Sequence, residues 1–543
     1  MDTEGSVIRL HLDIFQYMIT CGFIHLIDLI YLSLCGSKSL SRILSNIKDI
    51  KVTFGERFSD PNELQTPSKF VLVDNSLDTE QVENAMTANN MSSFNVTRVR
   101  FYIGRSCYGI RNFKFPPSVR SVTFIRTSIR NFNLVKEDVD SFPNIIQSLS
   151  VSKLPAISKL QLLLNWPDES YAAILQTLSV ISKTLVTLHI CFPVEYLYGG
   201  FDLKPIAKLE VLQSAEIIFI TKSSLRKLDQ SVFETCLASF LKSMLPDTLG
   251  TLHMIYQSNS MHNRIHMDSA SIMVLPPHLT RLSLMNLIEF GDKNVIPICA
   301  ALPPSITRLL CTNSVLGIST WHALPHLPLS IINLAIECSE YDDLFLIPDL
   351  TVFPTNLKAV EFIDIADCNL EWMEQHDMSH IEQLTFTDGW SMRPPILSSN
   401  IRFDSVTKLD CYRSGMFDDF TNDDDNDHSR AVSAMFPSLN KLVISLTEYC
   451  EAEIILKMLP LSITSLKIYA MAHFDIKFDM LTNLQTLKYH ERFQRDDDSF
   501  ALKKLPSSLK KLVLVGNRDS LHHARHLITS RCTATYKYSS ENY

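Results

Sequence analysis

The chain has 543 residues, of which 46% are hydrophobic, and it carries a formal net charge of −9. This charge argues against a general nucleic-acid binder, because such proteins usually carry a basic stripe. Glycine is scarce, at 14 residues, and neither GxGxxG nor GxxxxGK(S/T) occurs, which excludes the common phosphate-binding loops. No G-x-S-x-G or other nucleophile signature occurs. We therefore expect a protein that is not an enzyme and holds no cofactor.

The amino-terminal part contains the strongest apolar run of the chain, over Ile14–Cys35. Its length matches the ~20 residues that a membrane-spanning helix needs. Asp28 lies inside the run, and a central Asp costs about 2.5–3.5 kcal/mol on insertion. No basic cluster precedes the run, whereas a secretory signal would require one. We favour two short buried helices, joined near Cys21 and Gly22, over a membrane segment.

The same region resembles an F-box. The matching residues are Leu10, Asp13, Ile14, Met18, Ile19, Asp28, Leu29, Leu32, Leu34 and Cys35. His11 stands where the family has Pro, and the usual Trp of the family is absent from this segment. The resemblance implies a helical module over residues 1–48 that docks on the Skp-type adaptor of a cullin ubiquitin ligase through apolar anchors on its helices. The implied adaptor-binding residues are Leu10, Ile14, Met18, Leu29 and Leu32.

After a predicted cap or linker over residues 49–94, one phrase recurs along the chain. It consists of an apolar residue, Pro, any residue, a small polar residue, and then apolar-x-x-apolar-x-apolar. It occurs as FPPSVRSVTF, LPDTLGTLHM, LPPHLTRLSL, LPPSITRLL, LPLSIINLAI, FPTNLKAVEF, LPLSITSLKI and LPSSLKKLVL. The copies that begin at Leu245, Leu275, Leu302, Leu327 and Phe353 lie 30, 27, 25 and 26 residues apart. A period of this size indicates a solenoid.

The end of the phrase alternates with period two, which predicts a short strand with one buried side. Pro precedes the strand because it would remove a hydrogen-bond donor from inside it. Each unit is too small to bury its own apolar side, so neighbouring units must stack into one parallel sheet. The segments between phrases, such as 229–244, look helical or irregular and return the chain. We predict a solenoid over residues 95–517, followed by a cap and tail over 518–543.

The repeat resembles the leucine-rich repeat. LKKLVLVGN (Leu509–Asn517) matches the L-x-x-L-x-L-x-x-N core of that family. The Leu/Phe-Pro-x-Ser-Leu-x-x-Leu opening is similar to the FNIP-type variant known from amoebae, although the Phe-Asn-x-Pro-Ile tail of that variant is missing. The resemblance implies an α/β fold, a curved solenoid with a parallel sheet on its concave face.

Two positions in each phrase point out of the core, because side chains alternate along a strand. When units stack, these positions form columns on the concave face, and we expect a protein partner to bind there. The basic members of the columns favour an acidic or phosphorylated segment as the partner. The predicted partner-binding residues are His253, Arg281, Ser283, Arg308, Asn333, Glu361, Gln383, Lys408, Asp410, Lys441, Lys467, Lys488 and Lys511.

Metal sites are not predicted. The 12 cysteines form no CxxC pair and no zinc-ligand spacing with His, so we expect reduced, mostly buried thiols, exemplified by Cys311 and Cys411. Asp423, Asp425 and Asp427 alternate as in a calcium loop, but the required Gly and Glu are missing, which favours a solvated acidic insertion. His522 and His526 lack a third ligand.

These patterns favour a non-catalytic, protein-binding solenoid that acts as the substrate receptor of a cullin-type ubiquitin ligase. A structural or scaffolding leucine-rich-repeat protein without a ubiquitin role is the alternative, and a membrane-anchored recognition protein is a third. Scattered cysteines without Cys-rich caps indicate a reducing compartment, so we expect the protein in the cytoplasm or nucleus.

Overall fold

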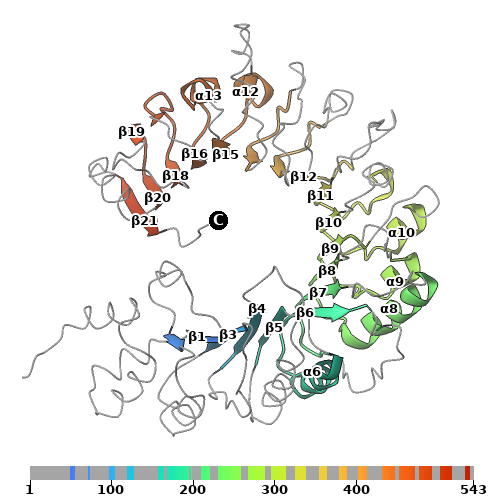
Figure 1. Ribbon diagram of the computed structural model, residues 1–543. Coiled ribbons are helices and arrows are strands. Elements are labelled where there is room, and N and C mark those ends of the chain that lie inside the picture. Colours follow the sequence, from blue (N-terminus) through green and yellow to red (C-terminus); the bar gives the residue numbers. More distant parts are fainter. Residues whose placement is uncertain are drawn as a thin grey trace, which may run out of the picture. The chain divides into compact units, whose positions relative to one another are not determined.

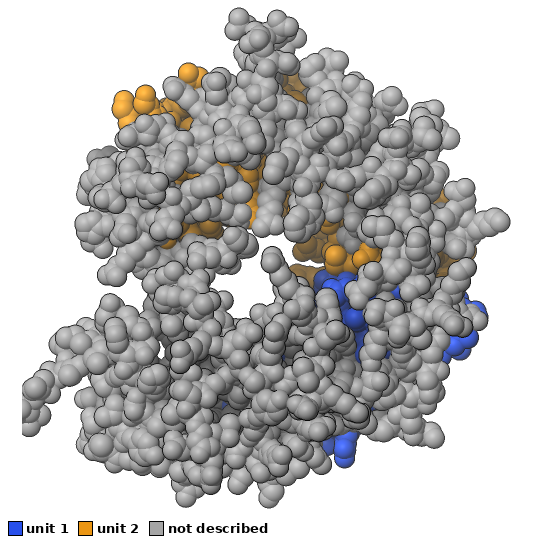
Figure 2. All heavy atoms as spheres, in the orientation of Figure 1, with its two compact units in different colours: residues 1–263, 274–278, 543 blue, residues 264–273, 279–542 orange. Residues whose placement is uncertain are grey.

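The computed structural model describes the repeats, and residues 1–48, for which the sequence predicts a helical module, lie outside the described residues. It divides into two compact units (Figure 2), unit 1 with Met1–Asn263 and Val274–His278, and unit 2 with Arg264–Met273 and Leu279–Asn542. The described residues are 49–54, 71–73, 97–103, 119–126, 157–163, 168–194, 197, 209–220, 230–257, 267–287, 295–312, 324–337, 354–363, 378–387, 402–412, 431–446, 452–470, 476–491, 502–516 and 532–538.

Unit 1 contains a parallel sheet in which β1 pairs with both β2 and β3, and each later strand pairs with the next. The strands are β1 (Asp49–Phe54), β2 (Val71–Val73), β3 (Arg98–Ile103), β4 (Ser121–Arg126), β5 (Lys159–Leu163), β6 (Thr187–Pro193), β7 (Ser214–Ile220) and β8 (Thr251–Gln257). Two helices, α6 (Asp168–Val180) and α8 (Gln230–Met244), lie in the return segments. The return segment 229–244, which looks helical or irregular in the sequence, is helical over Gln230–Met244.

Helix α8 packs one apolar stripe on the buried side of the neighbouring strands. Its fully buried residues recur at helical spacing and are Phe233, Leu237, Phe240, Leu241 and Met244. The ring centroid of Phe240 lies 5.1 Å from that of Phe192 on β6 and 6.3 Å from that of Phe219 on β7. Aromatic contacts thus tie the helix to two successive strands.

Unit 2 repeats the same scheme, with parallel pairing from β9 to β21. The strands of this sheet are β9 (Arg281–Met285), β10 (Arg308–Thr312), β11 (Asn333–Glu337), β12 (Ala359–Ile363), β13 (Gln383–Thr387), β14 (Lys408–Cys411), β15 (Lys441–Leu446), β16 (Ser465–Ala470), β18 (Thr486–Glu491), β20 (Lys511–Gly516) and β21 (Thr533–Tyr538). Within this unit the strands follow the inner, concave side of an arc (Figure 1).

Short elements occupy the outer side of the arc in unit 2 (Figure 1). They are α9 (Ser269–Met273), α10 (Val295–Ala301), the 3-10 helix η4 (Leu324–His326), α12 (Ala431–Met435), α13 (Ala452–Met458), and the strand pair β17 (Ile476–Lys477) and β19 (Leu502–Lys504). None of the helices that the structure describes is long and apolar enough to span a membrane. The apolar run at 14–35 lies outside that description.

One buried column runs through unit 2, as the repeat predicts. Its members are register partners on successive strands, and none is more than 3% exposed. They are Leu282, Leu309, Leu334, Val360, Leu384, Leu409, Leu442, Leu466, Leu487 and Leu512. A second inward column includes Cys311 and Cys411, at 2% and 1% exposure. The expectation that these two thiols are buried is confirmed.

In copies of the phrase such as LPPSITRLL and LPLSITSLKI, Pro closes a turn before the strand. The backbone carbonyl of Pro303 accepts a hydrogen bond from the amide of Ile306 at 3.1 Å, and Pro460 makes the same bond to Ile463 at 3.2 Å. The carbonyl of the residue before the strand then accepts hydrogen bonds from two successive amides of the next unit. The carbonyl of Thr280, for example, accepts from the amides of Thr307 and Arg308. These bonds satisfy the backbone where it leaves the turn and joins the sheet.

The small polar residue of the phrase links each unit to the one before it. The hydroxyl of Ser305 donates to the carbonyl of Leu279 at 2.7 Å, and that of Ser508 donates to Leu484 at 2.8 Å. Where Asn replaces Ser, its longer amide reaches further, as Asn356 does to Leu329 at 2.7 Å. The sequence shows a preference for a small polar residue at this position, and the structure explains it by a hydrogen bond to the preceding unit.

The two units have the architecture of a leucine-rich-repeat solenoid, because each turn of chain adds one parallel strand and one buried column position. Asn286, at the end of the LTRLSLMN phrase, adopts a φ of 58° directly after β9, a left-handed conformation that Asn tolerates. β1 and β2 lie in the range predicted as a cap or linker, and β21 lies in the range predicted as a cap and tail.

Candidate functional site

The strands present an open face, the side opposite the buried columns, and every predicted partner-binding residue lies on it. His253 is on β8 of unit 1, and the others are on β9 to β20 of unit 2. None of them is buried. In unit 2 the register aligns Arg281 with Arg308, Lys408 with Lys441, and Lys467 with Lys488. The structure thus brings these side chains into neighbouring positions.

The open face of β14, β15, β16, β18 and β20 is rich in lysine, and we name it the lysine face. Its lysines are Lys408, Lys441, Lys467, Lys488 and Lys511. Asp410 is the one described carboxylate among the outward positions of these strands, and its Oδ1 accepts a hydrogen bond from the amide of Tyr412 at 3.1 Å. Ammonium groups therefore outnumber carboxylates on this face.

Three rings, which we name the ring row, border the lysines: Tyr412 directly after β14, Tyr469 on β16 and His490 on β18. The centroids of Tyr412 and Tyr469 are 4.2 Å apart, and those of Tyr469 and His490 are 4.5 Å apart. The Nζ atom of Lys467 lies 4.3 Å from the centroid of Tyr469, a cation–π distance. Sequence reasoning missed these rings, because it considered only the two outward positions inside the phrase.

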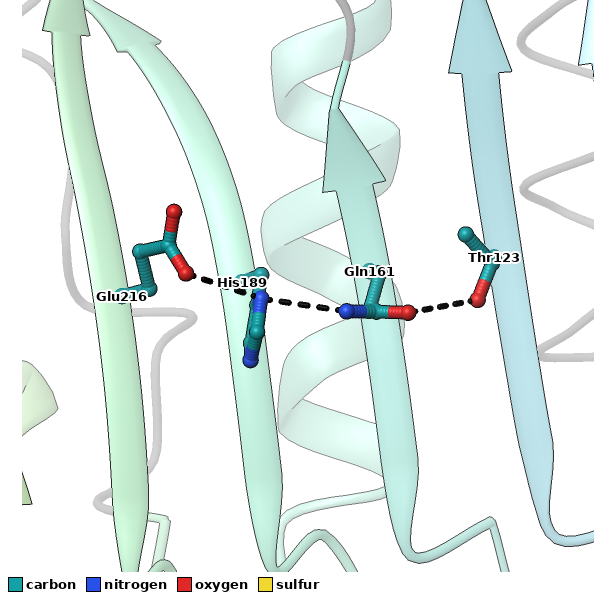
Figure 3. Close-up of polar contacts among 4 residues, drawn as sticks. All are labelled: Thr123, Gln161, His189 and Glu216. Carbon is teal, nitrogen blue, oxygen red and sulfur yellow. Dashed lines mark hydrogen bonds and ion pairs between the residues drawn. The ribbon is translucent and has the colours of Figure 1, made fainter. Parts of the chain in front are cut away.

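The open face of unit 1 carries a different feature, a row of polar side chains across β4 to β7 (Figure 3). The hydroxyl of Thr123 donates to Oε1 of Gln161 at 2.8 Å. Nε2 of Gln161 lies 3.1 Å from Nδ1 of His189, and that nitrogen lies 3.0 Å from Oε2 of Glu216. The four residues are register partners on adjacent strands.

The protonation of His189 decides which of its two contacts is a hydrogen bond. A protonated Nδ1 donates to Glu216, whereas an unprotonated Nδ1 accepts from Gln161. The contact to His189 lowers the pKa of the Glu216 carboxyl, against the opposing effect of burial, and His253 and Lys159 add to the lowering. Burial lowers the pKa of His253 on the next strand. Glu216 is thus a carboxylate held between imidazoles.

This polar row is suited to holding and orienting a partner group rather than to nucleophilic catalysis. The hydroxyl of Thr123 is bonded to Gln161 and lies two strands away from His189, so His189 does not activate it. Across the described ranges, no three His, Cys, Asp or Glu side chains are grouped as metal ligands. Burial raises the pKa of Cys191 and of Cys299 to about 12, so both thiols stay protonated at neutral pH.

The residues with which the F-box-like segment is expected to bind an adaptor all lie outside the described residues. They are Leu10, Ile14, Met18, Leu29 and Leu32. The acidic insertion with Asp423, Asp425 and Asp427, and the pair His522 and His526, also lie outside them. The predictions for these segments stay predictions.

No protein-family model matches this chain, and no curated protein matches its sequence. Among solved structures, the chain is similar to the crystal structure of the leucine-rich repeat-containing protein LegL7 from Legionella pneumophila, with a TM-score of 0.31 and 14% identity. The match covers 53% of this chain and 90% of that chain. A TM-score this low supports no structural conclusion, so the fold assignment rests on the strand register and the buried columns.

Proposed function

We propose that this protein is a non-catalytic binding protein whose repeats hold a protein partner on the open face of unit 2. The observation that carries the proposal is the register, which aligns exposed and half-buried polar side chains on consecutive strands from β9 to β20. Solenoids use such extended surfaces to bind other proteins.

The finer part of the proposal assigns the chain to a cullin-type ubiquitin ligase as its substrate receptor. It is supported by the F-box-like pattern of residues 1–48, which precedes the repeats in the order expected of such receptors. The module binds a Skp-type adaptor through its apolar helix faces, and the repeats bind the protein to be modified. This role belongs to the cytoplasm or the nucleus.

Binding of the intact chain to a purified Skp-type adaptor tests this assignment. Ile14→Asp combined with Met18→Asp places charges on the apolar anchors, so we expect loss of adaptor binding at micromolar concentration. Leu329→Asp combined with Leu461→Asp is the matched control, because these leucines are 67% and 62% exposed in the repeats. The control should bind the adaptor like the native chain.

Two results would overturn the ligase role. One is a native chain that ignores the adaptor at micromolar concentration, and the other is equal loss of binding in both variants. The repeats would then act as a scaffold without a ubiquitin role. Retention of the segment in a carbonate-washed membrane fraction would instead favour an anchor, despite the cost of Asp28.

A further inference from the structure

We infer that the lysine face binds an extended acidic peptide segment, rich in Asp or Glu, from the partner protein. This inference rests on the proposed function and specifies the chemistry of the partner. Of the outward side chains that the structure describes on β14, β15, β16, β18 and β20, five are lysines and one is a carboxylate. A peptide that supplies carboxylates complements this excess of positive charge.

The dimensions of the face suit an extended segment. Its five strands are neighbours in one sheet, and strands lie about 4.8 Å apart, so the lysines span about 19 Å across them. An extended peptide rises about 3.3 Å per residue, so about six residues cover this span and turn alternate side chains to one side. Alternating carboxylates would therefore meet Lys408, Lys441 and Lys511 in one column, or Lys467 and Lys488 in the next.

The cations on this face favour carboxylates over phosphate groups. Every described outward cation here is a lysine, whereas the arginines at outward positions of unit 2, Arg281 and Arg308, lie on β9 and β10. Arginine forks bind phosphate with two parallel hydrogen bonds, which lysine cannot form. A row of point charges suits carboxylates that are spread along a strand.

The ring row argues against single-stranded nucleic acid as the ligand. Nucleic-acid platforms stack bases on open ring faces. The ring of Tyr469 has Tyr412 on one side and His490 on the other, with centroids at 4.2 and 4.5 Å, so neighbouring rings already cover its faces. The net charge of −9 also gives no general attraction for phosphate backbones.

Fluorescence anisotropy with the full-length chain tests the inference. The probe is a labelled peptide of alternating Glu and Ser, and the matched peptide has Gln in place of each Glu. We expect the Glu peptide to bind at least about tenfold more tightly, with an affinity that falls as salt screens the exposed charges. A labelled oligouridine of similar length is the third probe and should bind more weakly than the Glu peptide.

Variants locate the binding on the molecule. Lys467→Gln combined with Lys488→Gln should weaken binding of the Glu peptide about three- to tenfold, since each exposed charge contact contributes modestly. Lys183→Gln combined with Lys242→Gln removes the same charge from two exposed positions outside the open face, in the turn after α6 and on α8, and should leave the affinity unchanged. Lys467→Arg combined with Lys488→Arg keeps the charge and should retain binding, which separates charge loss from misfolding.

Three outcomes would overturn the inference: equal binding of the Glu and Gln peptides, equal weakening by the Lys467/Lys488 pair and the Lys183/Lys242 control pair, or tighter binding of oligouridine. Adaptor binding is measured on the same preparations. If the peptide fails while the adaptor still binds, the acidic-peptide inference is wrong and the ligase assignment stands. If the adaptor does not bind while the peptide does, the ligase assignment is wrong and the acidic-peptide inference stands.

Discussion

At the scale of single residues, the buried column of unit 2 tolerates no charge. Leu309 is 1% exposed and pairs in register with Leu282 and Leu334. Leu309→Asp would bury an unpaired carboxylate, so we expect a loss of more than about 4 kcal/mol of stability. Arg308→Asp on the same strand is exposed and should change stability little. Urea denaturation followed by circular dichroism compares them, and equal midpoints would contradict the assigned register.

The polar row of unit 1 gives a prediction for pH. The folded-state pKa of Glu216 lies below its usual value of 4.5, so the carboxylate stabilises the fold at neutral pH, and this contribution is lost as pH falls below 4.5 and through the folded pKa. Glu216→Gln should therefore cost about 0.5–1.5 kcal/mol near pH 7 and progressively less in acid.

Thermal melts of native protein and Glu216→Gln across the acid range measure this effect. Glu210→Gln removes an exposed carboxylate from the same unit and serves as the control, with no expected pH-dependent difference. A gap between native protein and Glu216→Gln that stays constant down to the lowest pH would show that Glu216 acts by shape rather than by charge.

At the scale of elements, the hydroxyl links between units invite a matched comparison. Ser508 donates to the carbonyl of Leu484 at 2.8 Å. Ser330 stands at the same position of its phrase, but its buried hydroxyl has no hydrogen-bond partner. Ser508→Ala should lower stability by about 1 kcal/mol, whereas Ser330→Ala should be neutral or slightly stabilising, because it removes an unsatisfied polar group. Chemical denaturation checks both, and equal costs would mean that the links do not stabilise the stack.

Sequence periodicity predicted most strands of the solenoid and both of its inward columns, because burial forces apolar residues into a fixed pattern. Within residues 95–517 it missed two strands of the long parallel sheets, β5 and β7, for local reasons. In LPAISKLQL (Leu154–Leu162) one residue fewer separates Pro from the next apolar position, and β7 carries Ala215 at the core position and no Pro before it. At these two strands the buried positions are filled by a smaller side chain or by side chains at a shifted spacing from Pro.

The contacts on the open face could not be predicted in the same way. Gln161 and Glu216, which flank His189, lie on the two missed strands, and their pairing depends on a register that spans 27 to 28 residues of chain. The contact of Tyr412 with Tyr469 passes over Ser445 of the intervening strand. Such neighbours follow from three-dimensional stacking, which no local pattern encodes.

At the scale of the whole molecule, the proposed receptor has two binding modules in one chain. The residues that would bind the adaptor lie before residue 48, and the lysine face begins at Lys408. Because the two modules share no residues, we expect occupancy of one to leave the other free. A receptor must hold the adaptor and its partner at the same time.

Sedimentation of a ternary mixture tests this central claim most directly. The labelled Glu-Ser peptide is centrifuged with the full-length chain, first alone and then with excess Skp-type adaptor. The account predicts that the adaptor moves the peptide signal to a faster-sedimenting species without reducing the bound fraction. A peptide signal that the adaptor displaces, or that it leaves at an unchanged sedimentation rate, would contradict it.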